Sequence, residues 1–92
     1  MEKRTLAKKL GTLVQRLRLE RGFSQETFAQ ACKIERAHVG KIERGEVNVT
    51  VATTLRLIEG LDLSLPGFFS KLERELDNVD EEDREPHQRT GA

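Results

Sequence analysis

The sequence contains no tryptophan and no tyrosine, and its four aromatic residues are all phenylalanine. It therefore lacks the aromatic platform on which proteins that bind RNA or single-stranded nucleic acid stack bases. A single cysteine, Cys32, cannot close an internal disulfide, and neither a Cys-x-x-Cys motif nor a metal-binding His pair occurs. We expect no metal and no other cofactor, and we expect Cys32 to pack as a small apolar side chain rather than to act in redox chemistry.

No apolar run approaches the roughly 20 residues that a membrane-spanning helix needs. The basic first residues lead into an amphipathic segment without the apolar block and cleavage site of a signal peptide, so we expect no membrane partner and a cytoplasmic location. His38 and His87 are far apart in the chain, and Cys32 lies at an expected core position. No nucleophile is placed beside a base, so we expect the protein not to be an enzyme.

The net charge of zero conceals an uneven distribution of charge along the chain. Residues 1–56 carry twelve Lys or Arg and six Glu, a net charge of +6. Residues 77–92 carry six acidic residues and two Arg, a net charge of −4, with almost no apolar side chains. Such a segment cannot bury enough apolar surface to fold, so the sequence predicts one domain over residues 1–76 and a disordered acidic tail over residues 77–92.

Residues 22–45, GFSQETFAQACKIERAHVGKIERG, predict two short helices joined by a tight turn. Ser24 suits the N-cap of the first helix, which begins near residue 25. Its apolar stripe consists of Phe28, Ala29 and Cys32, and Ile34 follows just past the turn.

The second helix of this pair is predicted from about residue 35 to residue 44. Its inward residues are Val39 and Ile42, three apart, and Gly45 suits its C-terminal stop. The other faces carry Arg36, Ala37, His38, Gly40 and Lys41. A polar outer face on the second of two such helices is typical of a helix-turn-helix that binds the major groove of DNA.

Three further helices are predicted around this pair, each with one apolar stripe. The first covers about residues 5–20 and contributes Leu6, Leu10, Leu13, Val14 and Leu17. The fourth follows Thr50 as N-cap and ends at Gly60, with Val51, Leu55 and Ile58 on one face, while Leu61 and Leu63 fill the bundle. The fifth has Pro66 at its first position and carries Phe68, Phe69, Leu72 and Leu76. The fold class is therefore a compact, all-α bundle of five helices.

These residues resemble the Cro/repressor-type helix-turn-helix family, also called the xenobiotic-response-element family, over about residues 6–63. The resemblance rests on RLRLERGFSQETFA, the small Ala29 at the helix crossing, Val39 and Ile42, and the closing IERG. Two positions depart from the family pattern. Lys33 stands where the turn usually has Gly, at a cost on the order of 1 kcal/mol if φ is positive, and Glu35 stands where a better N-cap is common.

The resemblance implies a role in DNA binding for several residues. Glu35, Arg36, Ala37 and Lys41 occupy positions that usually meet bases, and Gln25 occupies one that usually meets a phosphate. Arg44, at the end of the same helix, and His38 are further candidates for phosphate contacts. The alternative for the outer face of this helix is an ordinary charged surface that contacts only solvent. The alternative for His38 is exposure to solvent without a phosphate contact. Gly40 has two explanations: either it permits a close approach of the backbone to DNA, or the helix simply tolerates a glycine there.

The resemblance also implies an ion pair between Arg18 and Glu43 that joins the first helix to the recognition helix, against the alternative of separate surface charges. The fifth helix has more apolar surface than a monomer needs. We therefore expect a homodimer interface at Phe69, Leu72 and Leu76, with Phe68 in the intrachain core.

Together these patterns predict a sequence-specific regulator of transcription that binds double-stranded DNA as a homodimer on a palindromic operator, similar to phage repressors and restriction-modification controller proteins. The alternative is an antitoxin-type or scaffold helix-turn-helix protein whose main partner is another protein, and RNA polymerase or a toxin protein is a further candidate partner. The acidic tail is either a solvated terminus or an intramolecular competitor of the DNA phosphates.

Overall fold

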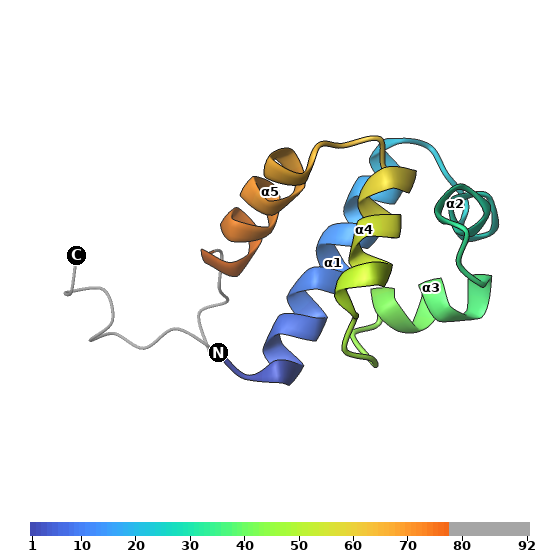
Figure 1. Ribbon diagram of the computed structural model, residues 1–92. Helices are drawn as coiled ribbons and strands as arrows, with labels where there is room; N and C mark the ends of the chain where they lie inside the picture. The colour runs from blue at the N-terminus through green and yellow to red at the C-terminus, as the bar shows by residue number, and fades with distance from the viewer. Residues whose placement is uncertain (78–92) are drawn as a thin grey trace.

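The computed structural model describes residues 1–77, and the segment 78–92, which holds nearly all of the predicted acidic tail, lies outside the described residues. The five predicted helices are all present (Figure 1): α1 at Lys3–Glu20, α2 at Gln25–Cys32, α3 at Arg36–Glu43, α4 at Val51–Gly60 and α5 at Leu65–Asp77. No strand occurs among residues 1–77, so the all-α fold class is confirmed. Asp77, predicted to begin the tail, is the last residue of α5.

The α2–turn–α3 unit forms through the local signals that the sequence predicts. The Ser24 side chain accepts a hydrogen bond from the Thr27 backbone N–H at 3.0 Å and so caps α2. Lys33 ends α2 in the left-handed conformation, with φ of 59°. Glu35 precedes α3 without a side-chain capping hydrogen bond, which leaves the first turn of α3 without a side-chain acceptor.

The helices meet around one core to which each contributes. α1 packs on α3 and α5, α2 packs on α3 and α4, and α4 also contacts α5. In Figure 1, α5 lies on the opposite side of the bundle from α2. The buried core consists of Leu10, Leu13, Val14, Leu17, Phe28, Ala29, Cys32, Val39, Ile42, Leu57, Ile58, Leu61 and Phe68. Ile34 and Leu63 are partly buried against it, as predicted.

Two glycines allow the helices to approach closely. A Cβ on Gly11 would collide with the backbone oxygens of Ile42 and Glu43, so glycine lets α1 lie against the end of α3. A Cβ on Gly60 would collide with the side chain of Cys32, so glycine lets α4 lie against α2. The approach also encloses the Cys32 thiol, and burial, with a smaller contribution from Glu59, raises its pKa to about 11. The thiol is therefore protonated near neutral pH.

The apolar stripes predicted for α1 and α4 are not buried along their whole length. Leu6, Val51 and Leu55 are 41%, 77% and 46% exposed, whereas Ile58, predicted on the same face as Val51 and Leu55, is buried. The buried stripe of α4 instead comprises Leu57 and Ile58, followed by Leu61. Because α4 carries apolar residues on two sides, its periodicity is compatible with either face pointing inward.

Two helix starts also differ from the prediction. α1 begins at Lys3, two residues before the predicted start, and Pro66 is the second residue of α5 rather than the first. The Ser64 hydroxyl accepts a hydrogen bond from the Gly67 N–H at 3.0 Å and so acts as the cap of α5. None of the helices within residues 1–77 is long and apolar enough to cross a membrane.

Candidate nucleic-acid interface

The outer face of α3 is polar and lies open. Arg36, Ala37 and Lys41 are exposed and His38 is half-buried, whereas Val39 and Ile42 on the inner face are fully buried. Glu35 is exposed at the start of the helix. α3 lies along the lower edge of the bundle in Figure 1, below α2. The four candidate base-contacting residues therefore share one accessible region of the surface.

A buried ion pair fixes α3 against α1. The Arg18 Nε donates to Glu43 Oε2 at 2.6 Å and its Nη2 donates to Oε1 at 3.2 Å, and the two side chains are only 8% and 1% exposed. The remaining Nη1 donates to the Phe23 carbonyl at 2.8 Å, just before α2. Three elements thus share one guanidinium, and a two-point contact of this kind sets the orientation of α3.

Gln25 joins this network from the first position of α2. Its Nε2 donates to Glu43 Oε1 at 2.9 Å, so the side-chain amide is engaged within the protein as well as half-exposed. An amide nitrogen carries two hydrogens, which leaves one available for another acceptor.

Arg44, the residue that follows α3, lies across Gly40. A Cβ on Gly40 would lie 3.1 Å from Arg44 Nη1, so glycine makes room for the guanidinium along α3. Arg44 donates to both carboxylate oxygens of Glu46, at 2.8 and 3.2 Å. This hydrogen bond raises the pKa of Arg44 and lowers the pKa of Glu46 from their ordinary values. Arg44 is exposed to solvent and has an intramolecular carboxylate partner.

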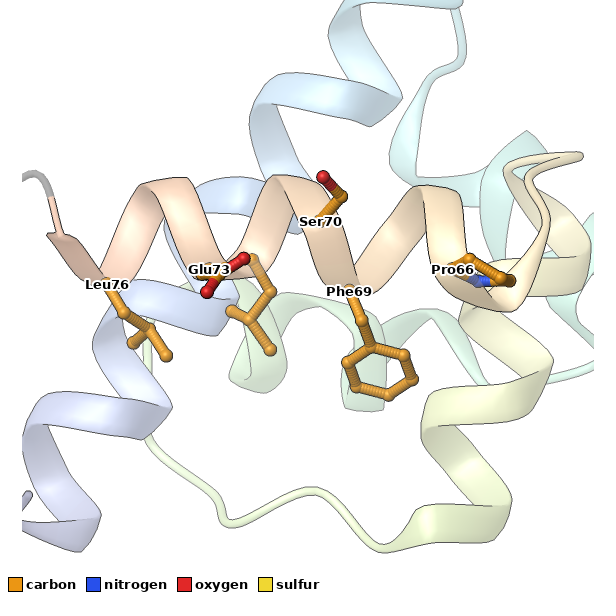
Figure 2. Close-up of a pocket in the computed structure, with 6 residues that line it drawn as sticks. Pro66, Phe69, Ser70, Glu73 and Leu76 are labelled. Carbon is orange, nitrogen blue, oxygen red and sulfur yellow. The ribbon is translucent and has the colours of Figure 1, made fainter.

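The three residues predicted for the dimer interface differ in exposure. Phe69 is 47% exposed, while Leu72 is partly buried against the core and Leu76 is half-buried. They line a shallow depression along α5 together with Pro66, Ser70 and Glu73. In Figure 2, Phe69 and Leu76 project from the same side of α5, whereas Ser70 points to the opposite side. Phe68 is fully buried, as predicted.

A second apolar groove joins this depression, and the sequence analysis did not predict it. It lies among α1, α4 and α5, and Phe69 and Leu72 line both hollows. Its other residues are Leu6, Leu10, Val49, Val51, Thr54, Leu55 and Leu65. The signal in the sequence was the pair Val51 and Leu55, one helical turn apart and separate from the stripe that begins at Leu57. We call the exposed apolar residues of both hollows, namely Leu6, Val51, Leu55, Leu65 and Phe69, the apolar surface.

The described residues offer no group of three or more His, Cys, Asp or Glu that could hold a metal ion.

Comparison with known proteins agrees with this architecture. The helix-turn-helix domain family matches residues 9–66, which is more than half of the chain, and the chain belongs to that family. It is 38% identical over 65 residues to the HTH-type transcriptional regulator SutR of Escherichia coli (strain K12), which covers 71% of this chain and 36% of SutR. The chain thus spans about a third of the length of SutR.

Controller proteins match over more of their own length. Control protein C.MunI of Mycoplasma sp is 32% identical over 68 residues, covering 73% of this chain and 92% of that protein. The wild-type restriction-modification controller protein C.Esp1396I superimposes with a TM-score of 0.74 at 31% identity, over 77% of this chain and 92% of that chain. The structure of its tetramer in complex with its natural 35 base-pair operator gives a TM-score of 0.76 at 30% identity, over 79% of this chain and 96% of that one.

Proposed function

We propose that the protein is a sequence-specific regulator of transcription that binds double-stranded DNA as a homodimer on a two-fold operator, without enzymatic activity. The observation that carries this proposal is the outer face of α3, whose polar side chains are exposed while a buried ion pair at Glu43 fixes the helix. An α-helix fits the major groove, and recognition depends on holding it at a defined angle.

In this proposal the first two turns of α3 contact the bases. Arg36 donates its planar fork to guanine O6 and N7, Ala37 contacts a thymine methyl group, and Glu35 accepts a hydrogen bond from cytosine N4. Lys41, one helical turn after Ala37, is the fourth base-contacting residue. All four side chains are exposed, so they are accessible to a partner.

The phosphate contacts come from the margins of the same surface. Gln25 uses the hydrogen of its amide that Glu43 does not engage. His38 is half-exposed on α3. Arg44 contacts a phosphate when its guanidinium releases the Glu46 carboxylate. These contacts position the protein on the duplex without selecting a base sequence.

In this proposal the homodimer interface comprises Phe69, Leu72 and Leu76. It extends over the rest of the apolar surface, namely Leu6, Val51, Leu55 and Leu65. A contiguous apolar region on a small domain is normally covered by a partner, and a two-fold axis places the same residues on both sides of the interface. Residues 1–76 would then hold both functions, and residues 77–92 would be a separate acidic tail. The solved operator complex of C.Esp1396I, a tetramer on DNA, supports assembly of this kind.

Selection of bound duplexes from a random library tests the proposal. We expect the full chain to recover a palindrome whose half-sites lie about one helical turn apart, because a dimer presents two copies of α3. Recovery of a site without two-fold symmetry would refute the dimeric mode of binding. Recovery of no preferred sequence, together with capture of a protein partner through the apolar surface, would favour the antitoxin-type or scaffold function.

A further inference from the structure

The beginning of α1 and the loop after α3 form a basic patch that the proposed recognition surface does not include. A hollow at this place is lined by Lys3, Arg4 and Ala7 of α1 and by the loop residues Gly45, Glu46, Val47 and Asn48. In Figure 1 the start of α1, the loop between α3 and α4, and α3 itself lie along the lower edge of the molecule. The patch therefore adjoins the end of the recognition helix.

The contact between the loop and α1 is tight and depends on a glycine. Gly45 has φ of +72°, and a Cβ there would lie 2.8 Å from the Cα of Lys8 and 2.7 Å from its Cγ. The clash with backbone cannot be relieved by moving a side chain, so glycine is required on both grounds. The position of α1 relative to the end of α3 is consequently fixed.

The basic side chains of the patch have no intramolecular partner among residues 1–77. Lys3, Arg4 and Lys8 are exposed, and none of them forms a hydrogen bond or an ion pair with another described residue. The loop carboxylate of Glu46 is already engaged by Arg44. Asn48, also exposed, adds an amide that can donate a hydrogen bond.

We propose that Lys3, Arg4, Lys8 and Asn48 form a second, sequence-independent contact with the phosphate backbone of DNA, beside the bases that α3 meets. The unpartnered positive charges match phosphates, and the tight loop contact holds them in a fixed relation to α3. Leu6, which belongs to the apolar surface, lies on the same helix. The patch thus contacts the part of each half-site nearest the partner subunit, toward the centre of the operator.

This inference rests on the proposed function, and neutralising two charges in the full chain tests it. The test variant is Arg4→Gln/Lys8→Gln. The matched control is Arg21→Gln/Arg56→Gln, which removes two charges elsewhere: Arg21 follows the opposite end of α1, about 20–26 Å along the helix from Lys8 and Arg4 at 1.5 Å per residue, and Arg56 lies on α4. Glutamine retains the helix propensity of arginine and lysine. The dissociation constants of the selected operator and of a scrambled duplex are measured over a series of KCl concentrations.

We expect the slope of log K against log salt concentration to fall by about 0.9 for each lost phosphate contact, thus by about 1–2 in the test variant. The control should keep the wild-type slope, and the ratio of affinities for operator and scrambled duplex should not change in either variant. A test slope equal to that of the control would overturn the inference. Tighter binding by the test variant would overturn it as well, because it would mean that the patch holds an acidic group rather than DNA. If the wild type itself does not prefer the operator, the proposed function fails independently of this result.

Discussion

The outer face of α3 and the apolar surface of α1, α4 and α5 belong to the same bundle, but different interactions hold the helices that carry them. α3 owes its orientation to a buried ion pair, in which Arg18 and Glu43 are almost fully enclosed. α5 packs through Phe68 and Leu72, and its ion pair between Arg16 and Glu75, at 2.8 Å, is open to solvent on the arginine side. The proposed recognition helix needs a fixed angle, which directional bonds supply, whereas the proposed dimer surface needs chiefly apolar area.

The largest effect should follow from breaking the ion pair beneath α3. Glu43→Ala leaves the Arg18 guanidinium buried without its carboxylate, and we expect the free energy of unfolding to fall by about 3–5 kcal/mol. Urea denaturation of the variant measures this. The control is Glu46→Ala, which removes an exposed ion pair and should change the same quantity by less than about 1 kcal/mol. Equal losses in the two variants would mean that burial does not distinguish the pairs.

The apolar surface should be disrupted by a charge at its exposed centre. Phe69→Asp would put a carboxylate into the proposed seam, and we expect monomers that bind the operator about 100-fold more weakly, because the two half-sites are no longer linked. Phe69 is a cleaner target than Leu72, since Leu72 also packs against the intrachain core.

Sedimentation over a concentration series reports the state of this variant, and circular dichroism reports its helix content. Leu19→Asp is the matched control, because Leu19 is 59% exposed but lines neither apolar hollow. A Phe69→Asp protein that remains dimeric, or a wild type that stays monomeric at high concentration, would rule out this interface.

On α3, Arg36→Ala should weaken operator binding by about 1–3 kcal/mol and relax the preference at one base pair in each half-site, since it removes a bidentate base contact. Binding to random duplexes should change less. Competition assays with single-base variants of the operator measure both effects, with Arg21→Ala as a control that removes the same charge outside α3. Equal losses on specific and random duplexes would instead assign Arg36 to a phosphate.

The smallest effects should come from the margins of the recognition surface. Arg44→Ala should weaken binding on all sequences and lower the salt slope by about 0.9, the value for one phosphate contact. Glu46→Gln should have the opposite effect on affinity, because it removes the carboxylate that engages Arg44 in the free protein. Gln25→Ala should weaken binding uniformly without altering the slope, because the amide is uncharged. A salt titration of the three variants checks these expectations, and an unchanged slope in Arg44→Ala would remove its phosphate contact.

Local signals made much of the fold predictable from the sequence. The cap at Ser24, the stop at Gly45 and the stripe of α1 from Leu10 to Leu17 each depend on residues within a few positions of one another. Even the unusual left-handed Lys33 could be anticipated, because the turn requires that conformation whatever residue occupies it.

The packing of α4 could not be predicted in the same way. Its sequence carries one apolar pair at Val51 and Leu55 and another at Leu57 and Ile58, and periodicity alone does not say which side another helix covers. The close approaches at Gly11 and Gly60 were also hidden, since the backbone or sulfur atom that excludes a side chain there belongs to a distant segment.

The sequence by itself thus determined that residues 1–77 form five helices, where most of them begin and end, and which helix presents arginine and lysine outward, because helix propensity, capping and periodicity are short-range properties. Only the tertiary structure decided that Leu6, Val51 and Leu55 join Phe69 in one apolar surface, and that Lys8 lies against the loop after α3. Those relations depend on how α1, α3, α4 and α5 pack on one another, and packing joins residues that are far apart in the chain.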